Sequence, residues 1–303
     1  MTNRVDLRVT CRFVLVLVLS LFFPGIAQAA DCSARLSLPW ETAGPGYSGD
    51  AIVRGPDCAN AVVLFLARRP GGEPKFDEAP DKVLPGNAPI ALEIVPVANV
   101  PALAKASDKA EMTKALPAAL GAWLRAQARP QKPTNRAELI AAGPTKGDCR
   151  VSDTLPWTAA GHGYAIDVFS DGTDCLNAAT ALVIRAPDGR PLYSAATPGF
   201  IVDIYHADLN TRADMKKALS SIETMTEDTT AKLPEWPEGL TDREITQGDF
   251  TTSVAGSFDR ISWNALREAR RPMLAVDPGI ESTSLVVLMS EGRVIEVGRS
   301  RQN

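Results

Sequence analysis

The sequence predicts an α+β protein built from tandem repeats of a small antiparallel sheet covered by a helix, with one disulfide in each full repeat. Three observations lead to this prediction. A stretch of 42 residues recurs 117 positions later, four cysteines fall at matching places in the two copies, and each copy combines short apolar runs with a helix-start signal. With 303 residues, 45% of them hydrophobic, the chain is long enough to bury a core.

The first copy, residues 31–72, aligns with residues 148–189 without a gap, and 18 of the 42 positions are identical. The shared pattern reads Asp-Cys, Leu-Pro-Trp, Ala-Gly-x-Gly-Tyr, Gly-x-Asp-Cys-x-Asn-Ala and Arg-x-Pro-x-Gly. A second match joins residues 110–116 to residues 213–219 at an offset of 103, so the first copy carries 14 additional residues before its helix.

A shorter third match places residues 182–184 on residues 285–287 and the pair Gly189-Arg190 on Gly292-Arg293. This partial copy has no cysteines. The predicted organisation is therefore a signal peptide 1–30, repeat unit 1 over 31–128, a linker 129–147, repeat unit 2 over 148–230, a linker 231–248 and a partial third unit 249–303.

The cysteines predict one disulfide within each full unit. Cys32 and Cys58 are 26 residues apart, and so are Cys149 and Cys175. Four cysteines allow three pairings, but tandem copies favour the local pairs, because each unit then closes on itself. In the chain-entropy description each bridge is worth ~3–4 kcal/mol.

Within each unit, the runs Val62–Leu66 and Ala181–Ile184 predict strands that are buried on both faces. Pro187-Asp188-Gly189 predicts a hairpin turn after the second run, since Pro presets φ and Gly accepts positive φ. The sheet of each unit should therefore be antiparallel, which is the basis of the α+β prediction.

Helices are predicted from Asp108, with Glu111 as a capping partner, from Thr211 to about Met225, and from Ser262 to Arg270. Pro117 falls inside the first of these helices, where it is expected to introduce a kink.

The first thirty residues have the layout of a cleaved secretory signal peptide. Three arginines precede an apolar run over residues 13–23, and small residues follow, with cleavage expected near Ala29 or Ala30. Eleven apolar residues cover only ~17 Å of a ~30 Å hydrocarbon core, which disfavours the alternative of an uncleaved anchor. A periplasmic or secreted protein without a transmembrane span in the mature chain is expected, and this fits the paired cysteines.

Composition argues against several functions. A net charge of −4 and a pI near 5.4 disfavour nucleic-acid binding. Only two histidines, His162 and His206, are present, neither with a second histidine at metal spacing, so no metal or other cofactor is predicted.

Two local motifs could suggest a ligand site. Gly44–Gly49 matches a dinucleotide-binding fingerprint, but no helix is expected after it and a turn is favoured. Asp167, Asp171 and Asp174 could suggest a calcium loop, although Phe169 and Ala178 occupy ligand positions of an EF-hand.

The repeated residues that could form a ligand surface are Trp40, Tyr47, Asp50, Trp157, Tyr164 and Asp167. Aromatic residues presented twice would give avidity, whereas core packing is the structural alternative and is favoured for small units. Carboxylates facing one another could also act as an acid–base pair. No complete catalytic set is visible, so no catalytic residue is predicted.

The function expected from the sequence is that of an exported, non-enzymatic binding or interaction protein of the bacterial envelope, whose partner is a protein or an envelope component. The reason is duplication without a duplicated catalytic set. The alternative is a cell-wall-directed hydrolase or hydrolase inhibitor with a site between the repeats, using Asp50, Asp167 or His162.

Overall fold

The computed structural model describes residues 31–68, 73–74, 89–127, 139–140, 149–172, 175, 178–198, 211–220, 225–276 and 282–303. These residues form a mixed α+β fold in which antiparallel sheets predominate. The expected signal peptide and His206 lie outside the described residues.

The first sheet has the strand order β1-β2-β3-β5, and every neighbouring pair is antiparallel. Its strands and the helix that packs on it are β1 (Ala34–Pro39), β2 (Ser48–Arg54), β3 (Val62–Arg68), β5 (Pro89–Pro96) and α2 (Lys109–Ala126). A 3-10 turn, η2 (Val97–Asn99), links β5 to the segment before α2.

The second sheet has the order β7-β8-β9-β10, again antiparallel throughout. Its elements are β7 (Val151–Pro156), η3 (Thr158–Ala160), β8 (Ala165–Asp171), β9 (Ala179–Arg185), β10 (Pro191–Pro198) and α4 (Arg212–Leu219).

The third sheet has six antiparallel strands in the order β11-β14-β15-β16-β13-β12. Its elements are β11 (Met225–Thr229), η4 (Thr230–Lys232), β12 (Glu244–Gln247), β13 (Phe250–Val254), α5 (Arg260–Glu268), β14 (Pro272–Val276), β15 (Thr283–Leu288) and β16 (Val294–Gln302). A separate two-stranded sheet pairs β4 (Glu73–Pro74) with β6 (Leu139–Ile140).

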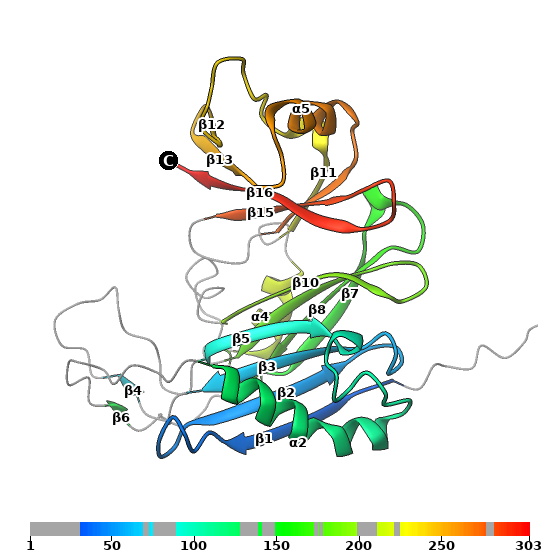
Figure 1. Ribbon diagram of the computed structural model, residues 1–303, viewed down its shortest axis with the longest axis vertical. Helices are drawn as coiled ribbons and strands as arrows, with labels where there is room; N and C mark the ends of the chain where they lie inside the picture. The colour runs from blue at the N-terminus through cyan, green and yellow to red at the C-terminus, as the bar shows by residue number, and fades with distance from the viewer. Residues whose placement is uncertain are drawn as a thin grey trace, which may run out of the picture.

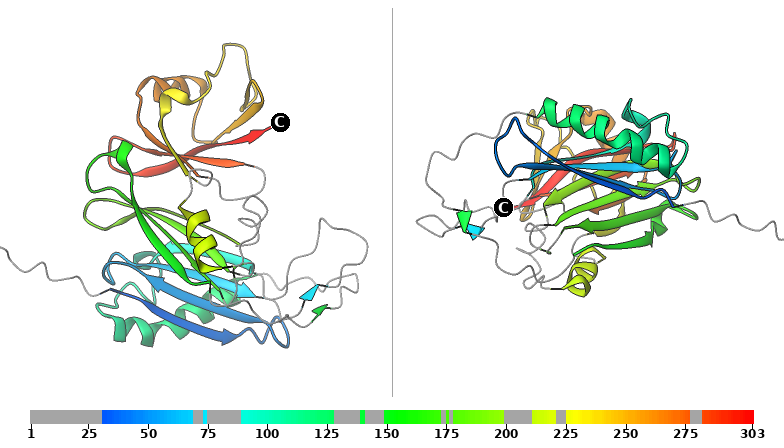
Figure 2. Two further views of the ribbon diagram at one scale, coloured as in Figure 1. Left: turned by 180° about the vertical axis from the view of Figure 1, so that it is seen from behind. Right: turned by 90° about the horizontal axis from the view of Figure 1, so that it is seen from below.

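The three large sheets are stacked as layers (Figure 1). Helix α2 lies outside the first sheet, the second sheet lies between the first and the third, and α5 lies beyond the third sheet. The view from behind shows the same succession of layers, with α4 beside the second sheet (Figure 2).

The first and second sheets pack face to face through positions that are 117 residues apart in the chain. Ile52, Val62, Leu64 and Leu66 from the first sheet meet Phe169, Ala179, Ala181 and Val183 from the second. The cluster combines large side chains with alanines, which permits close packing between the layers. This shared core holds the two halves of the chain together.

Strand β3 is buried on both faces, as its continuous apolar sequence predicts. Leu64 points into the core between the sheets, whereas Phe65 points to the other side and stacks on Trp123 of α2 with ring centroids 5.4 Å apart. Strand β9 is buried along its whole length in the same way.

A polar contact links the second sheet to the third. The Tyr193 hydroxyl donates to Glu296 Oε2 at 3.4 Å, and Arg299 Nε donates to Glu296 Oε1 at 2.8 Å. Burial, and then the negative charge of Glu296, raises the pKa of Tyr193 to about 12. Tyr193 therefore stays neutral and remains a donor at physiological pH.

Both disulfides expected from the sequence are present. Cys32 is bonded to Cys58 and Cys149 to Cys175, and the Cα atoms are 5.0 Å and 4.9 Å apart. Beside each bridge a glycine is required, because a Cβ on Gly55 or Gly172 would lie 2.4 or 2.5 Å from a backbone Cα.

The turns predicted at Gly189 and at Gly44–Gly49 are present. Gly189 has φ of 85°, and the Ala186 N–H donates to the Arg190 carbonyl across the turn. Gly44 and Gly46, with φ of 121° and 80°, lie in the turn that joins β1 to β2. The element after this turn is a strand rather than a helix, so the glycines serve a hairpin.

Helix α2 begins after Asp108, whose side chain accepts from the Glu111 N–H, as predicted. Helix α4 begins after Thr211, as predicted, and Thr211 and Asp214 form a capping box. The expected extension of α4 to Met225 is wrong, because the helix ends at Leu219 and Met225 starts a strand paired with β14. Pairing between distant strands has overridden the local pattern.

We expect the core between the first two sheets to contribute strongly to stability. Replacing the fully buried Leu64 by Ala should lower the free energy of unfolding by about 2–5 kcal/mol, because the cavity cannot collapse between two rigid sheets. Urea denaturation measures this change. Ile261→Ala, on the exposed face of α5, is the matched control and should shift stability by less than about 0.5 kcal/mol. Equal effects of the two changes would contradict this packing.

Candidate functional site

The facing sheets carry buried ion pairs at matching positions. In the first sheet, Arg68 Nε donates to Asp50 Oδ2 at 2.8 Å, and the Ser37 hydroxyl donates to Asp50 Oδ1. The side chains of Asp50 and Arg68 are only 7% and 10% exposed. Such a pair is stable inside a protein because each charge has its partner and additional hydrogen bonds.

The same arrangement occurs 117 residues later. Arg185 Nε donates to Asp167 Oδ2, and the Thr154 hydroxyl donates to Asp167 Oδ1 at 2.8 Å. Arg185 Nη1 also donates to the carbonyl oxygens of Asn60, at 2.6 Å, and Gly189, at 3.0 Å. Arg185 therefore ties the second sheet to the loop before β3 of the first.

Beside each ion pair the two sheets face each other. Near Asp50 and Arg68 an ion pair bridges the two sheets, and we call this place the filled crevice. Arg35 Nη1 donates to Asp171 Oδ1, Arg35 Nη2 lies 3.9 Å from Asp50 Oδ2, and Arg150 Nε lies 3.6 Å from Asp171 Oδ2. A carboxylate from the second sheet is thus held between two arginines, one from each half of the chain.

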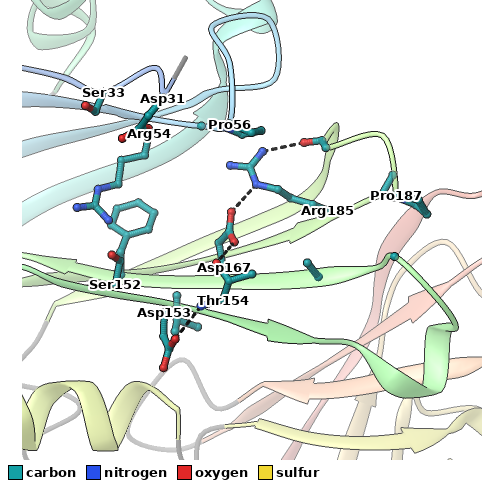
Figure 3. A pocket seen from close by; sticks show the side chains of 17 residues that line it. Asp31, Ser33, Arg54, Pro56, Ser152, Asp153, Thr154, Asp167, Arg185 and Pro187 are labelled. Carbon is teal, nitrogen blue, oxygen red and sulfur yellow. Dashed lines mark hydrogen bonds and ion pairs between the residues drawn. The ribbon is translucent and has the colours of Figure 1, made fainter. Parts of the chain in front are cut away.

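The other crevice is open and forms a cleft of ≈ 730 Å³ (Figure 3). It is lined by the residues just before β1, the end of β2, strands β7 and β8, and the turn between β9 and β10. The lining residues are Asp31, Ser33, Arg54, Gly55, Pro56, Ser152, Asp153, Thr154, Gly163, Ala165, Asp167, Val168, Phe169, Arg185, Ala186, Pro187 and Gly189. We call it the inter-sheet cleft.

Arg54 is the distinctive charge of the inter-sheet cleft. It extends from the first sheet toward Ser152 on the second (Figure 3), and its guanidinium carbon lies 5.1 Å from the ring centroid of Phe169. Among the residues that the structure describes, Arg54 makes no ion pair. A guanidinium stacked on an aromatic ring keeps the donors at its edge available.

The other charges of the cleft have partners or lie at its rim. Asp167 is held by Arg185, and Asp153 lies 3.5 Å from Lys216 Nζ. Asp31 is exposed. The inner part of the cleft therefore offers one cation without a counter-ion, together with hydroxyl groups and an aromatic face.

The repeated aromatic residues are placed inside the units. Trp40 and Trp157 are 4% and 0% exposed, and each lies edge-on to the tyrosine of its unit, Tyr47 or Tyr164, at centroid distances of 6.3 and 6.4 Å. Tyr47 and Tyr164 are partly buried against the same cores. The structure thus places the tryptophans in the cores, which was the alternative to a ligand surface.

Asp50 and Asp167, two alternatives for a site between the repeats, occupy different places. Asp167 lines the inter-sheet cleft, whereas Asp50 belongs to the filled crevice. His162 lines a neighbouring hollow of ≈ 530 Å³ around the β7–β8 turn. Asp174 lies outside the described residues, and within the described part of the chain no group of three potential ligands could hold a metal ion.

The sequence did not single out Arg54 or Ser152. A signal was present, because positions 54 and 171 carry Arg and Asp, and positions 35 and 152 carry Arg and Ser. These differences between otherwise similar copies separate the filled crevice from the open one. Only the three-dimensional contact of the copies shows which differences face each other.

Comparison of the chain with protein-family models, with curated proteins and with solved structures found no match. Among the described helices, none has the length and apolar character needed to cross a membrane.

At the edge of the cleft, Asp57 supplies a pH-dependent contact. The Asn60 side-chain amide donates to Asp57 Oδ2 at 3.0 Å and lowers the pKa of this carboxyl; the backbone N–H of Asn60 acts in the same direction, and burial opposes them. A lowered folded-state pKa contributes stability above the ordinary value of 3.8 and loses it as the pH falls through the folded-state pKa.

We therefore expect Asn60→Ala to lower the free energy of unfolding by about 1 kcal/mol at pH 7 and by much less at pH 2. Urea denaturation at the two pH values measures the difference. Asn99→Ala, on the exposed turn η2, is the matched control and should show no such pH dependence. An Asn60→Ala effect that is equal at both pH values would contradict the assignment.

Proposed function

We propose that the chain contains two copies of one disulfide-stapled unit and a partial third copy. The strand orders β1-β2-β3-β5 and β7-β8-β9-β10 support this proposal. So do the equivalent hydrogen bonds Trp40 N–H to Tyr47 O, at 2.9 Å, and Trp157 N–H to Tyr164 O, at 3.0 Å. In each unit a helix, α2 or α4, packs on the face of the sheet that points away from the other unit.

The partial third copy is supported by a shared turn. The Gly189 N–H donates to the Ala186 carbonyl at 2.9 Å, and the Gly292 N–H donates to the Met289 carbonyl at 3.0 Å. Strands β14, β15 and β16 are also paired in the same antiparallel order as β8, β9 and β10 of the second unit. In this copy the helix α5 precedes the hairpin instead of following it.

We further propose that the protein is an exported, non-enzymatic binding protein of the envelope, and that its ligand enters the inter-sheet cleft. The observation that carries this proposal is the open cleft with Arg54 unpaired among the described residues, set beside an equivalent crevice that the protein's own side chains fill. Clefts of this size between packed units are common ligand sites. Two disulfides are typical of chains that work in an oxidising compartment.

The positions of the carboxylates favour binding over hydrolysis. Both oxygens of Asp167 are engaged, one by Arg185 and one by Thr154, and Asp50 is engaged in the same way by Arg68 and Ser37. A general acid or base needs an oxygen that can exchange a proton with the substrate. These ion pairs instead form a rigid frame around the cleft.

The proposal predicts that filling the cleft abolishes capture of a ligand from the envelope. Ser152→Trp places an indole in the cleft, whereas Gln247→Trp, on the exposed part of β12, adds the same side chain elsewhere. The exported protein, immobilised, should retain an envelope component, and Gln247→Trp should retain it equally. Ser152→Trp should retain at least about tenfold less, as expected when a hot-spot pocket is blocked. Mass spectrometry of the eluates measures the difference.

Equal retention by Ser152→Trp would exclude the cleft as the binding site. Release of fragments from purified cell wall by the wild type, with no retained component, would instead favour the hydrolase that the sequence left as an alternative. Thermal unfolding of both variants checks that each is folded.

A further inference from the structure

We infer that the inter-sheet cleft binds a carboxylate at Arg54, supplied by a monocarboxylate ligand such as the C-terminus of a short peptide. This inference rests on the proposed binding function and names the chemical class of its ligand. Its starting point is a reversal of charge between two crevices that the fold makes equivalent.

In the filled crevice a carboxylate is the central group. Asp171 lies between Arg35, from the first sheet, and Arg150, from the second. Arg35 crosses the space between the sheets to reach Asp171, whereas Arg150 approaches Asp171 from within the second half of the chain. The carboxylate that pairs with Arg35 and Arg150 is thus supplied by the chain itself, as Asp171.

In the open cleft, each of these positions has its counterpart 117 residues away. Arg54 takes the place of Asp171, Ser152 takes the place of Arg35, and Ser33 takes the place of Arg150. The central group has become a cation, and its two long neighbours have become short hydroxyl side chains. Figure 3 shows Arg54 and Ser33 on the first sheet and Ser152 on the second, around the same space. Among the described residues no carboxylate forms an ion pair with Arg54, so a carboxylate from a ligand could take that place.

The local geometry suits a planar anion. Phe169 is only 3% exposed, and the Arg54 guanidinium carbon lies over its ring at 5.1 Å from the centroid, which holds the guanidinium in place. The N–H donors at the edge of a guanidinium match the two oxygens of a carboxylate. The hydroxyl groups of Ser33 and Ser152 are additional donors on either side of this edge.

The charges around the cleft favour a single negative charge over a phosphate dianion. Arg54 is the one cation of the lining that no described carboxylate neutralises, since Arg185 is paired with Asp167. Asp31, which is exposed and lines the cleft, would repel a dianion more strongly than a monoanion. A monoanion gains the bidentate contact with Arg54 and meets less repulsion.

The rest of the cleft suits a small apolar or peptide body. Pro56, Ala165 and Pro187 line it alongside Phe169. A cleft of ≈ 730 Å³ lies within the range of about 300–1,000 Å³ that is typical of small-molecule sites. A peptide of a few small residues, ending at Arg54, meets both requirements.

The test uses N-acetyl-trialanine with a free carboxylate and the same peptide with a C-terminal amide. Titration calorimetry of the exported protein should show that the free acid binds at least about tenfold more tightly than the amide. Arg54→Gln should remove this preference, and Arg54→Lys should restore part of it, because charge returns without the planar fork. Arg125→Gln, on the exposed last turn of α2, removes the same charge elsewhere and should leave both affinities unchanged.

A second variant tests the reversal of charge without emptying the cleft. Arg54→Asp combined with Ser152→Arg recreates the pattern of Asp171 and Arg35, so it should fold at least as stably as the wild type and lose the acid-selective binding. Equal binding of acid and amide by the wild type, an unchanged preference in Arg54→Gln, or no binding of either peptide at millimolar concentration would overturn the inference. Cleft-dependent capture of an envelope component would still stand in any of these cases, so the two proposals fail separately.

Discussion

The burial of β3 and β9 on both faces is the constraint on which the rest of this structure depends. A sheet whose central strand is apolar on both sides must be covered twice. For the first sheet, α2 covers one face and the second sheet covers the other. The second sheet must also be covered on both faces, but its helix α4 has 8 residues where α2 has 18. At ~1.5 Å per residue α4 is only ~12 Å long, too short to cover a four-stranded sheet. The third sheet fills the remainder, with Leu274, Val286 and Leu288 in the same core as Trp157 and Met215.

The inter-sheet cleft is a consequence of this packing. The two sheets share a core, and the Asp50–Arg68 and Asp167–Arg185 pairs, 117 residues apart in sequence, lie beside two places where the sheets face each other. Whether such a place is filled depends on a few side chains. Arg35 is long enough to cross one crevice and reach both Asp50 and Asp171, whereas Ser152 cannot cross the other.

Much of the fold was predictable because its signals are local. The apolar runs of β3 and β9, the caps at Asp108 and Thr211 and the turn at Gly189 each depend on a few neighbouring residues. The disulfides followed from the equal spacing of the cysteines. The end of α4 and the start of β11 were not predictable in this way, because pairing with β14 decides them from about fifty residues away. For the same reason the site was missed, since Arg54 and Phe169 meet only when the two sheets pack.

Within this chain, residues that the two copies share and residues in which they differ have separate roles. The shared tryptophans, cysteines, aspartates and arginines are buried, bonded or paired, so their role is in folding. The repeated tryptophan–tyrosine pair is thus better explained by folding than by avidity, because in both copies the tryptophan is buried and lies edge-on to the tyrosine. Once the frame is fixed by shared residues, a change at its edge alters the chemistry of a crevice without altering the fold. Arg54 opposite Ser152, where the other crevice has Asp171 opposite Arg35, is such a change, and it converts a contact within the protein into one that a ligand can make.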